Sequence, residues 1–451
     1  MIELGLQRIS RLLAATPLPW RAVHVAGTNG KGSICAYVSA MLDVYNKSTW
    51  RSRRGDPPIN FGMFNSPHLV DRWDCISINQ KTIPASAFHD IEANVLRRNA
   101  EESVGASEFE LLTATAFEAF TTKCVDVAVV EVGLGGRLDA TNVIGQTEQR
   151  PPEAQRFRPP PLVTAFASIG LDHQEFLGHT LEAIAAEKAG ILKPGVPVVY
   201  DWSNPANVNE VIHAMAERLR CAADGQRYDV GQRAKHLGLT SLLDAPSHVR
   251  HNSAVALQAT WCALERLGRM PTSDTKKASA LDDLERDMLK VVETVRFPGR
   301  QQTISIRQLT GRQHHVLLDG AHNHQSALAL AQAVGKLRGG AGGRASVTWV
   351  LAASGSKDVK EILSPLIKNG DSVFAVEFGP VDGMPWVKPL PTAKLLDMSK
   401  ALAPESLCLH DHGNDLRSAI QAASDRAGEG PLVIAGSLYL VGDVLRLLRG
   451  D

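Results

Sequence analysis

Residues 22–33, AVHVAGTNGKGS, join a short apolar run to a glycine-rich loop, and an apolar, helix-like segment follows at 34–45. Glycines let backbone N–H groups turn towards phosphate oxygens, and the start of a helix adds the positive end of its dipole. Lys31 can reach the β- and γ-phosphates, and the Ser33 hydroxyl stands where it can meet Mg²⁺. Gly32 separates this lysine from the serine, unlike the common GxxxxGK[ST] spacing. We predict a nucleoside triphosphate site, against the alternative of a glycine turn with a surface lysine.

Strand-like and helix-like apolar runs alternate along the first half of the chain. Strands are predicted at 125–132, 162–169 and 196–200, and helices at 109–120 and 181–192. This alternation predicts a mostly parallel sheet with helices on both faces, in which ligands gather at the carboxyl ends of the strands.

The alternation restarts beyond 296–300. Further strands are predicted at 315–318, 347–352, 371–376 and 431–435. A chain of 451 residues is too long for one compact core. We therefore expect an α/β domain over 1–295 and a smaller, Rossmann-like α/β domain over 296–451.

Other segments have no predicted chemistry. An amphipathic helix is predicted at the N-terminus, ending near Pro17. Solvated loops or linkers are predicted at 50–60, 145–161, 270–280 and 338–344.

Composition excludes several classes of protein. Lysine plus arginine equal aspartate plus glutamate at 48 each, which argues against a nucleic-acid-binding surface. No apolar run approaches the roughly 20 residues that a membrane-spanning helix needs. The six cysteines lack CxxC spacing and are expected to be free thiols in a reducing compartment. We expect a cytoplasmic enzyme, and the basic residues near the N-terminus leave a mitochondrial pool open.

Ionisable side chains lie at or just beyond the carboxyl ends of two of the predicted strands. Glu131 ends the run VDVAVVE, where a buried carboxylate needs a magnesium ion or a salt bridge. His173 follows the next strand and is either a ligand or a structural residue. Lys188 lies in a predicted helix, where a lysine is usually a solvated charge. The glycines after Glu131 do not complete a dinucleotide fingerprint, because position 138 is Leu138.

The second half carries two motifs with related chemistry. FPGR ends in Arg300, whose guanidinium can bind phosphate oxygens bidentately. LLDGAHN places Asp319 at the end of a predicted strand. These motifs suggest that the second domain contributes to the nucleotide site.

Together these motifs resemble the folylpolyglutamate synthase/dihydrofolate synthase family of Mur-ligase-like, ATP-dependent amide ligases. The matching segments run in family order over nearly the whole chain: HVAGTNGKGS, SPHL, SEFELLTATAF, EVGLGGRLDATNV, LDHQEFLG, EKAGILKPG, FPGR, DGAHN and AGSLYLVGDV. The resemblance implies a P-loop ATPase domain like the central domain of Mur ligases. It also implies a C-terminal domain that closes over ATP and L-glutamate.

The resemblance implies roles for individual residues. The residues implied to bind the ATP phosphates are Gly27, Thr28, Asn29, Gly30, Lys31, Gly32 and Ser33. Other nucleotide contacts are implied for Asn252, Arg300, Asp319 and His322. Two Mg²⁺ sites are implied, with Ser66, Glu131 and His173 as ligands. Catalytic roles fall to Lys31, His173 and Lys188, the last matching a lysine that the family carries as a carbamate. The residues implied to bind the pterin substrate are Ser107, Glu108, Phe109, Glu110, Leu138, Asp139 and Ala140.

The implied activity joins L-glutamate to 7,8-dihydropteroate through an acyl phosphate, and we expect a monomer. GLQRISRLL, LDHQEFLG and DGMPW favour this first addition over lengthening the glutamate tail of reduced folates. Tail lengthening, or both activities in one protein, remains the alternative. A cell-wall-type amino-acid ligase is disfavoured by the segment GLGGRLDATNV. A non-catalytic nucleotide-binding switch is disfavoured because it has no need of the motifs around Lys188 and Asp319.

Three features depart from the family pattern. Val249 stands where the family has glutamine, and His324 stands where it commonly has proline. The third is the proline-rich insertion at 145–161.

Overall fold

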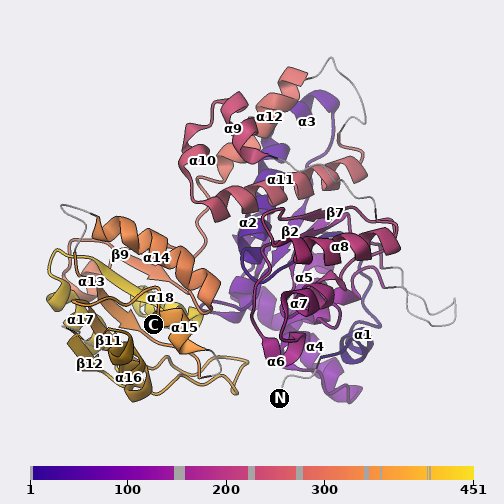
Figure 1. Ribbon diagram of the computed structural model, residues 1–451. Helices are drawn as coiled ribbons and strands as arrows, with labels where there is room; N and C mark the ends of the chain where they lie inside the picture. The colour runs from indigo at the N-terminus through magenta and orange to yellow at the C-terminus, as the bar shows by residue number, and fades with distance from the viewer. Residues whose placement is uncertain are drawn as a thin grey trace. The chain divides into compact units, whose positions relative to one another are not determined.

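The chain folds into two compact units, Met1–Val295 and Arg296–Asp451, and each is built on its own sheet in the computed structural model (Figure 1). The structure describes residues 4–146, 158–221, 229–270, 278–339, 345–355, 358–403, 405 and 408–450.

The first unit contains a seven-stranded sheet in the order β4-β3-β2-β5-β1-β6-β7. Its strands are β1 (Arg21–Ala26), β2 (Phe61–Phe64), β3 (Ile76–Ile78), β4 (Lys81–Thr82), β5 (Val127–Glu131), β6 (Val163–Phe166) and β7 (Val198–Tyr200). All neighbours are parallel except β3 and β4, which extend one edge in antiparallel pairing. Because β5 and β6 flank β1 on opposite sides, the strand order reverses at the carboxyl end of β1, where ligands bind in open α/β sheets.

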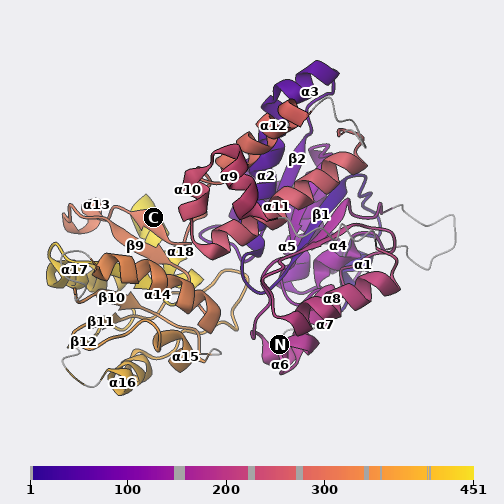
Figure 2. The same ribbon diagram turned by 45° about the horizontal axis from the view of Figure 1, so that its top comes forward.

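Helices cover both faces of this sheet (Figures 1 and 2). One face carries α2 (Lys31–Lys47), α3 (Thr49–Arg54), α9 (Val230–Leu237), α10 (Thr240–Asp244), α11 (Ser247–Arg266) and α12 (Ala278–Val291). The other carries α1 (Gln7–Leu12), α4 (Ala85–Glu101), α5 (Glu108–Thr122), α7 (Leu181–Ala189) and α8 (Ala206–Arg218). The short helices η1 (Arg72–Cys75), η2 (Ala140–Val143) and α6 (Gln174–Leu177) lie in connections.

The second unit contains a six-stranded sheet in the order β12-β11-β10-β13-β9-β8. Its strands are β8 (Gln302–Ile304), β9 (Val316–Asp319), β10 (Thr348–Leu351), β11 (Ser372–Ala375), β12 (Cys408–Asp411) and β13 (Leu432–Ala435). Only β8 is antiparallel to its neighbour. Its helices are α13 (Arg307–Thr310), α14 (His324–Arg338), α15 (Val359–Leu363), α16 (Thr392–Leu402), α17 (Leu416–Ala427) and α18 (Leu438–Arg449).

The predicted α/β class with mostly parallel sheets is confirmed in both units. None of the helices in the described ranges combines the length and apolarity of a membrane span. All six cysteines are free thiols.

The prediction of a loop over 50–60 is wrong, because α3 occupies its first half. The Ser48 side chain accepts a hydrogen bond from the Arg51 amide and caps the start of α3, and Gly55 ends α3 in the left-handed conformation. Trp50 is buried against the core formed with α2 and α11. A tertiary contact therefore makes a helix of an otherwise polar segment.

The loop predicted at 338–344 is wrong at its first residue, because Arg338 ends α14 and is buried. The loop at 270–280 is likewise wrong at its end, since α12 begins at Ala278. Residues 147–157, 271–277 and 340–344 of the predicted loops lie outside the described residues. The N-terminal helix α1 is shorter than predicted and ends at Leu12.

Arg338 owes its burial to Asp371, which is fully buried. The two guanidinium nitrogens Nη1 and Nη2 donate to the two carboxylate oxygens at 2.7 and 2.6 Å. The Val347 amide and the Trp349 indole N–H also donate to the carboxylate, at 2.9 and 3.0 Å. The carboxylate thus ties α14 to β10 and to the start of β11.

Replacing Asp371 with alanine leaves the Arg338 charge buried without its partner. The Asp371→Ala variant should therefore lose about 3–5 kcal/mol of the free energy of unfolding of the second unit. The exposed Asp283–Arg286 pair offers a control, and Asp283→Ala should cost about 0–1 kcal/mol. Urea titration measures both, and equal losses in the two variants would contradict this role of Asp371.

Candidate nucleotide and substrate site

The loop 27–33 leaves β1 and is fixed against the segment that follows β6. The amides of Thr28 and Asn29 donate to the Ser168 carbonyl at 2.8 and 3.2 Å. The Thr28 hydroxyl donates to the Gly170 carbonyl at 3.0 Å. A Cβ atom at Gly27, whose φ is +146°, would lie 2.7 Å from the Cβ of Ala167. Only glycine fits this approach, so the loop takes its shape from a neighbouring strand.

Asn252, on α11, packs against the same loop. A Cβ atom at Gly30, whose φ is +94°, would lie 2.5 Å from the Asn252 Oδ1 atom. The structure therefore brings Asn252 to the predicted phosphate loop. Val249, one turn earlier, is partly buried against the apolar core of that face.

Lys31 and Glu131 lie beside each other at the carboxyl edge of the sheet. Lys31 is the first residue of α2, and Glu131 is the last residue of β5. The Lys31 Nζ atom lies 3.8 Å from Glu131 Oε1 and donates to the Thr28 carbonyl at 3.2 Å. The Ser66 amide donates to Glu131 Oε2 at 3.3 Å. Three predicted site residues thus meet, and Glu131 has the salt-bridge partner that its burial requires.

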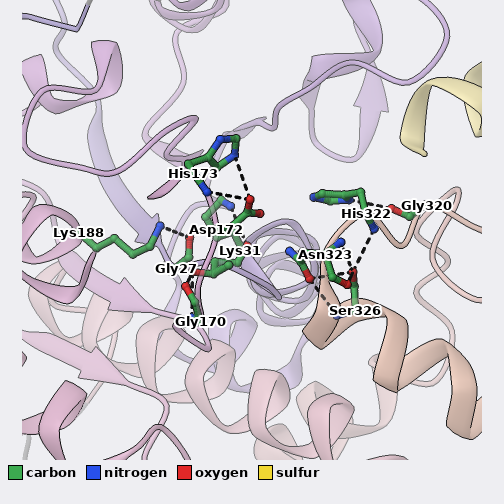
Figure 3. A network of polar contacts seen from close by, with 11 residues as sticks. Gly27, Lys31, Gly170, Asp172, His173, Lys188, Gly320, His322, Asn323 and Ser326 are labelled. Carbon is green, nitrogen blue, oxygen red and sulfur yellow. Dashed lines mark hydrogen bonds and ion pairs between the residues drawn. The ribbon is translucent and has the colours of Figure 1, made fainter. Parts of the chain in front are cut away.

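His173 lies at the N-terminal end of α6, with a φ of +51°. Its backbone amide donates to Asp172 Oδ1 at 2.9 Å, and its ring Nε2 lies 3.9 Å from the same oxygen (Figure 3). The imidazole is 41% exposed, so it is accessible to a ligand.

The donors present suit a magnesium ion that also binds phosphate. Within the described ranges, no three His, Cys, Asp or Glu side chains converge as a metal site. Magnesium commonly takes one or two carboxylates, with substrate phosphates and water completing its octahedron. The buried carboxylate of Glu131 beside the phosphate loop fits this partial donor set.

Lys188 is buried near the end of α7, and its Nζ atom donates to the Gly27 carbonyl at 2.8 Å (Figure 3). Burial lowers the pKa of Lys188 to about 7, and the charge of Lys31 contributes to this lowering. The solvated charge expected from sequence alone is therefore wrong. A large share of this amine is neutral near pH 7, and a neutral amine is a nucleophile.

The segments around Lys188 and Gly136 pack backbone against backbone. A Cβ atom at Gly136 would lie 2.6 Å from the Lys188 carbonyl oxygen. At Gly190 it would lie 2.3 Å from the Cβ of Arg137. Gly190 ends α7 with a φ of −61°, so it is needed for this close approach and not for a left-handed cap.

The predicted pterin contacts at 107–110 begin α5. Ser107 and Glu110 form a capping box, and Arg8 Nε donates to Glu110 Oε2 at 2.9 Å. Glu108 pairs with Arg72 at 2.9 Å. Phe109 covers Gly133, where a Cβ atom would lie 2.4 Å from the ring. The cap therefore uses Ser107 and the Oε2 atom of Glu110, while the Glu110 Oε1 atom has no hydrogen-bond partner among the described residues. Phe109 faces the loop that follows β5.

The other predicted pterin segment, 138–140, returns to that same loop. The Asp139 carboxylate is buried and accepts from the Leu134 amide at 2.8 Å and from the Thr141 amide at 3.0 Å. The Leu138 carbonyl accepts from the Gly5 amide at 3.3 Å, and Ala140 is buried at the start of η2. Asp139 thus holds the shape of the loop.

The predicted residues of the second unit form a cluster of their own. Asp319 ends β9, and its carboxylate accepts from the Gln301 and Ala321 amides, both at 2.7 Å. Burial raises the pKa of Asp319, which the charge of Arg300 opposes. The His322 Nδ1 atom lies 2.8 Å from the Gly320 carbonyl oxygen (Figure 3). The FPGR and DGAHN motifs are thus joined.

His324 is the first residue of α14, a position that proline also favours. Its Nδ1 atom lies 3.1 Å from the Glu361 carbonyl oxygen. The departure from the family pattern therefore leaves the start of α14 intact.

Sequence reasoning missed the partners that fix the loops. Ser168 and Gly170 hold Thr28, and no local pattern marks them. The pairing of β1 with β6 brings them together. Sequence reasoning also missed that Thr141 holds Asp139 and that His24, 117 positions away, holds Thr141.

Comparisons with known proteins agree with this arrangement. A family model described as "Dihydrofolate synthetase, C-terminal domain" matches residues 302–447. The "Probable dihydrofolate synthetase" of Schizosaccharomyces pombe is 33% identical over 457 residues, covering 100% of this chain and 99% of that protein. The dihydrofolate synthetase of Saccharomyces cerevisiae is 33% identical over 456 residues, covering 99% and 98%.

A solved structure of Mycobacterium tuberculosis folylpolyglutamate synthase, complexed with ADP and AMPPCP, is 26% identical. It aligns with a TM-score of 0.72 over 99% of this chain and 96% of that one. The chain therefore belongs to the folylpolyglutamate synthase/dihydrofolate synthase family, and the two relatives that are 33% identical over their full length are named as dihydrofolate synthetases.

Proposed function

We propose that this protein joins L-glutamate to 7,8-dihydropteroate, with ATP converted to ADP and phosphate, to give 7,8-dihydrofolate. The observation that carries the proposal is the phosphate loop 27–33, held at the carboxyl end of β1 with Lys31 beside Glu131. The names of the full-length relatives from Schizosaccharomyces pombe and Saccharomyces cerevisiae support the choice of dihydropteroate as substrate.

The reaction proceeds through an acyl phosphate. An oxygen of the dihydropteroate carboxylate attacks the γ-phosphorus of ATP, and the bond to the β-phosphate oxygen breaks to release ADP. The neutral amine of L-glutamate then attacks the activated carbonyl carbon, loses a proton and expels phosphate, which leaves an amide. The backbone N–H groups of residues 30–33 and the Lys31 ammonium bind the phosphates and offset their charge, while the Thr28 and Asn29 amides hold the loop against Ser168.

Ser66, Glu131 and His173 are the residues that would hold Mg²⁺, at two sites shared with the ATP phosphates. The metal supplies positive charge that offsets the charge of the phosphate oxygens. Glu131 would then exchange its salt bridge with Lys31 for the cation, which frees the Lys31 ammonium for phosphate.

We propose that Lys188 is carbamylated. The neutral amine attacks CO₂, an N–C bond forms, and a proton leaves. The product would offer an anionic oxygen to the second Mg²⁺. The pKa of about 7 supports this step, because an ordinary lysine is almost fully protonated at neutral pH.

The remaining predicted residues are assigned to substrates. Asn252, Arg300, Asp319 and His322 are proposed nucleotide contacts, and the second unit is proposed to close over ATP and L-glutamate. The segments 107–110 and 138–140 are proposed to receive the pterin substrate, with Asp139 acting through the backbone groups that it holds.

We also propose a monomer in the cytoplasm that binds neither nucleic acid nor membranes. The equal numbers of basic and acidic residues, 48 each, support this proposal. Gel filtration with light scattering measures the oligomeric state.

Substrate choice separates this function from tail lengthening, the activity named for the relative from M. tuberculosis. Purified protein, ATP, Mg²⁺ and glutamate are offered dihydropteroate or tetrahydrofolate, and mass spectrometry measures the extended product. Only dihydropteroate should gain one glutamate. Extension of tetrahydrofolate alone would assign the tail-lengthening activity, and ADP binding with neither product would favour a nucleotide switch.

Replacing Lys31 with alanine removes the lysine that belongs to the phosphate loop itself. The Lys31→Ala variant should lose at least about a hundredfold of glutamate-dependent ADP release, as expected for one charged group in a preorganised site. Lys47, exposed at the other end of α2, is the matched control. Lys47→Ala should keep wild-type turnover, and undiminished turnover in Lys31→Ala would refute its role.

Carbamylation of Lys188 is testable by ¹³C NMR at fixed dissolved ¹³CO₂. Because only the neutral amine reacts, the carbamate signal should fall as the pH falls through about 7. Lys188→Met should abolish the signal. Lys193, a partly buried lysine whose pKa burial lowers to about 8, is the control, and Lys193→Met should retain the signal. Activity of Lys188→Ala should be partly restored by short-chain carboxylates, and full activity without them would count against a carbamate.

A further inference from the structure

His24 is a fully buried histidine in the middle of β1, the strand that leads into the phosphate loop. Its ring Nε2 lies 2.9 Å from the Thr141 hydroxyl oxygen. Its Nδ1 atom is buried without a hydrogen-bond partner among the described residues. The imidazole therefore makes one polar contact, directed at the loop after β5.

Thr141 passes this contact on to Asp139. The Thr141 hydroxyl donates to Asp139 Oδ1 at 2.5 Å. The amides of Leu134 and Thr141 also donate to the Asp139 carboxylate. Burial raises the pKa of Asp139, and these hydrogen bonds oppose that rise. The Thr141 hydroxyl has one proton, which it donates to Asp139, so its oxygen accepts in turn from the His24 Nε2–H.

The protonation of His24 is consistent with this order. Burial lowers the pKa of His24 to about 3, and the charge of Lys193 contributes. The ring is therefore neutral at physiological pH, with its single proton on Nε2. The chain of donors runs from His24 through Thr141 to Asp139, whose other oxygen binds the Leu134 amide.

We propose that His24 is a positioning residue for the loop 133–142, acting through Thr141 and Asp139. The inference rests on the proposed function, which assigns 138–140 to the pterin substrate. It adds a direct link between the strand that carries the phosphate loop and the loop that receives dihydropteroate.

A purely apolar role does not account for a histidine here. An unpaired buried Nδ1 atom costs about 1–3 kcal/mol, which a leucine at this position would avoid. What histidine supplies is one rigid N–H donor, two atoms beyond Cγ, aimed at Thr141. A glutamine can place its amide N–H near the position of Nε2, whereas an asparagine is too short to do so.

The test compares His24→Leu, His24→Gln, His24→Asn and Thr141→Val by steady-state kinetics. His24→Leu, His24→Asn and Thr141→Val should raise the KM for dihydropteroate about tenfold, since small misplacements of positioning groups are costly. The KM for ATP should stay within about twofold, and His24→Gln should recover most of the loss. The double variant His24→Leu/Thr141→Val should be no worse than either single variant, because the two residues act in one chain.

Hydrogen exchange gives a readout that needs no substrate. The amides of Leu134 and Thr141 should exchange faster in His24→Leu than in the wild type, and at the wild-type rate in His24→Gln. A lowered unfolding midpoint with unchanged KM and unchanged exchange would overturn the proposal. So would equal losses in His24→Gln and His24→Asn.

Failure of the proposed function is recognised separately. A wild-type protein that binds ADP but does not extend dihydropteroate fails the substrate assignment. The exchange rates then still decide whether His24 holds the loop, and unaltered exchange in His24→Leu refutes it.

Discussion

The contact between the loop after β1 and the segment after β6 is the constraint on which the candidate site depends. At Gly27 the two backbones approach so closely that a side chain would collide with Ala167. The Ser168 carbonyl then receives the amides of Thr28 and Asn29, and the Gly27 carbonyl accepts from the Lys188 amine. Parallel pairing of β6 with β1 makes this approach possible. The loop is thus preorganised by the sheet and by a buried lysine.

Close approach also explains several other motif glycines. In the first unit, Gly136 and Gly190 let the segment after β5 lie against the end of α7. In the second unit, a side chain at Gly320 would meet Leu438, and one at Gly436 would meet the Ala352 carbonyl. The DGAHN and AGSLYL motifs therefore meet for steric reasons. Because these glycines have no side chain, the neighbouring segments can approach closely, and this approach brings the chemical groups together.

Local pattern was sufficient for the features that depend on local physics. The apolar alternation predicted most of the parallel strands but not β2 or β12, and the helix predicted at 34–45 lies within α2, which begins three residues earlier at Lys31. Local sequence pattern failed where a contact with a residue distant in the sequence determines the structure. The polar segment that contains Trp50 forms a helix because Trp50 packs on the core. Arg338 is buried because its guanidinium pairs with the Asp371 carboxylate. The capping box of α5 joins Ser107 to Glu110, three residues later, so it depends on local sequence alone. The link from His24 to Asp139 runs through Thr141, which lies 117 positions from His24, and no local pattern reveals it.

The central claim is that the pteroate carboxylate is activated by phosphorylation in a site built on the loop 27–33. Transfer of ¹⁸O tests it most directly. Dihydropteroate labelled in its carboxylate is turned over with ATP, Mg²⁺ and glutamate, and the released phosphate is analysed by mass spectrometry. Activation through an acyl phosphate predicts one ¹⁸O atom in each phosphate released by this turnover. Unlabelled phosphate accompanying dihydrofolate formation would contradict it.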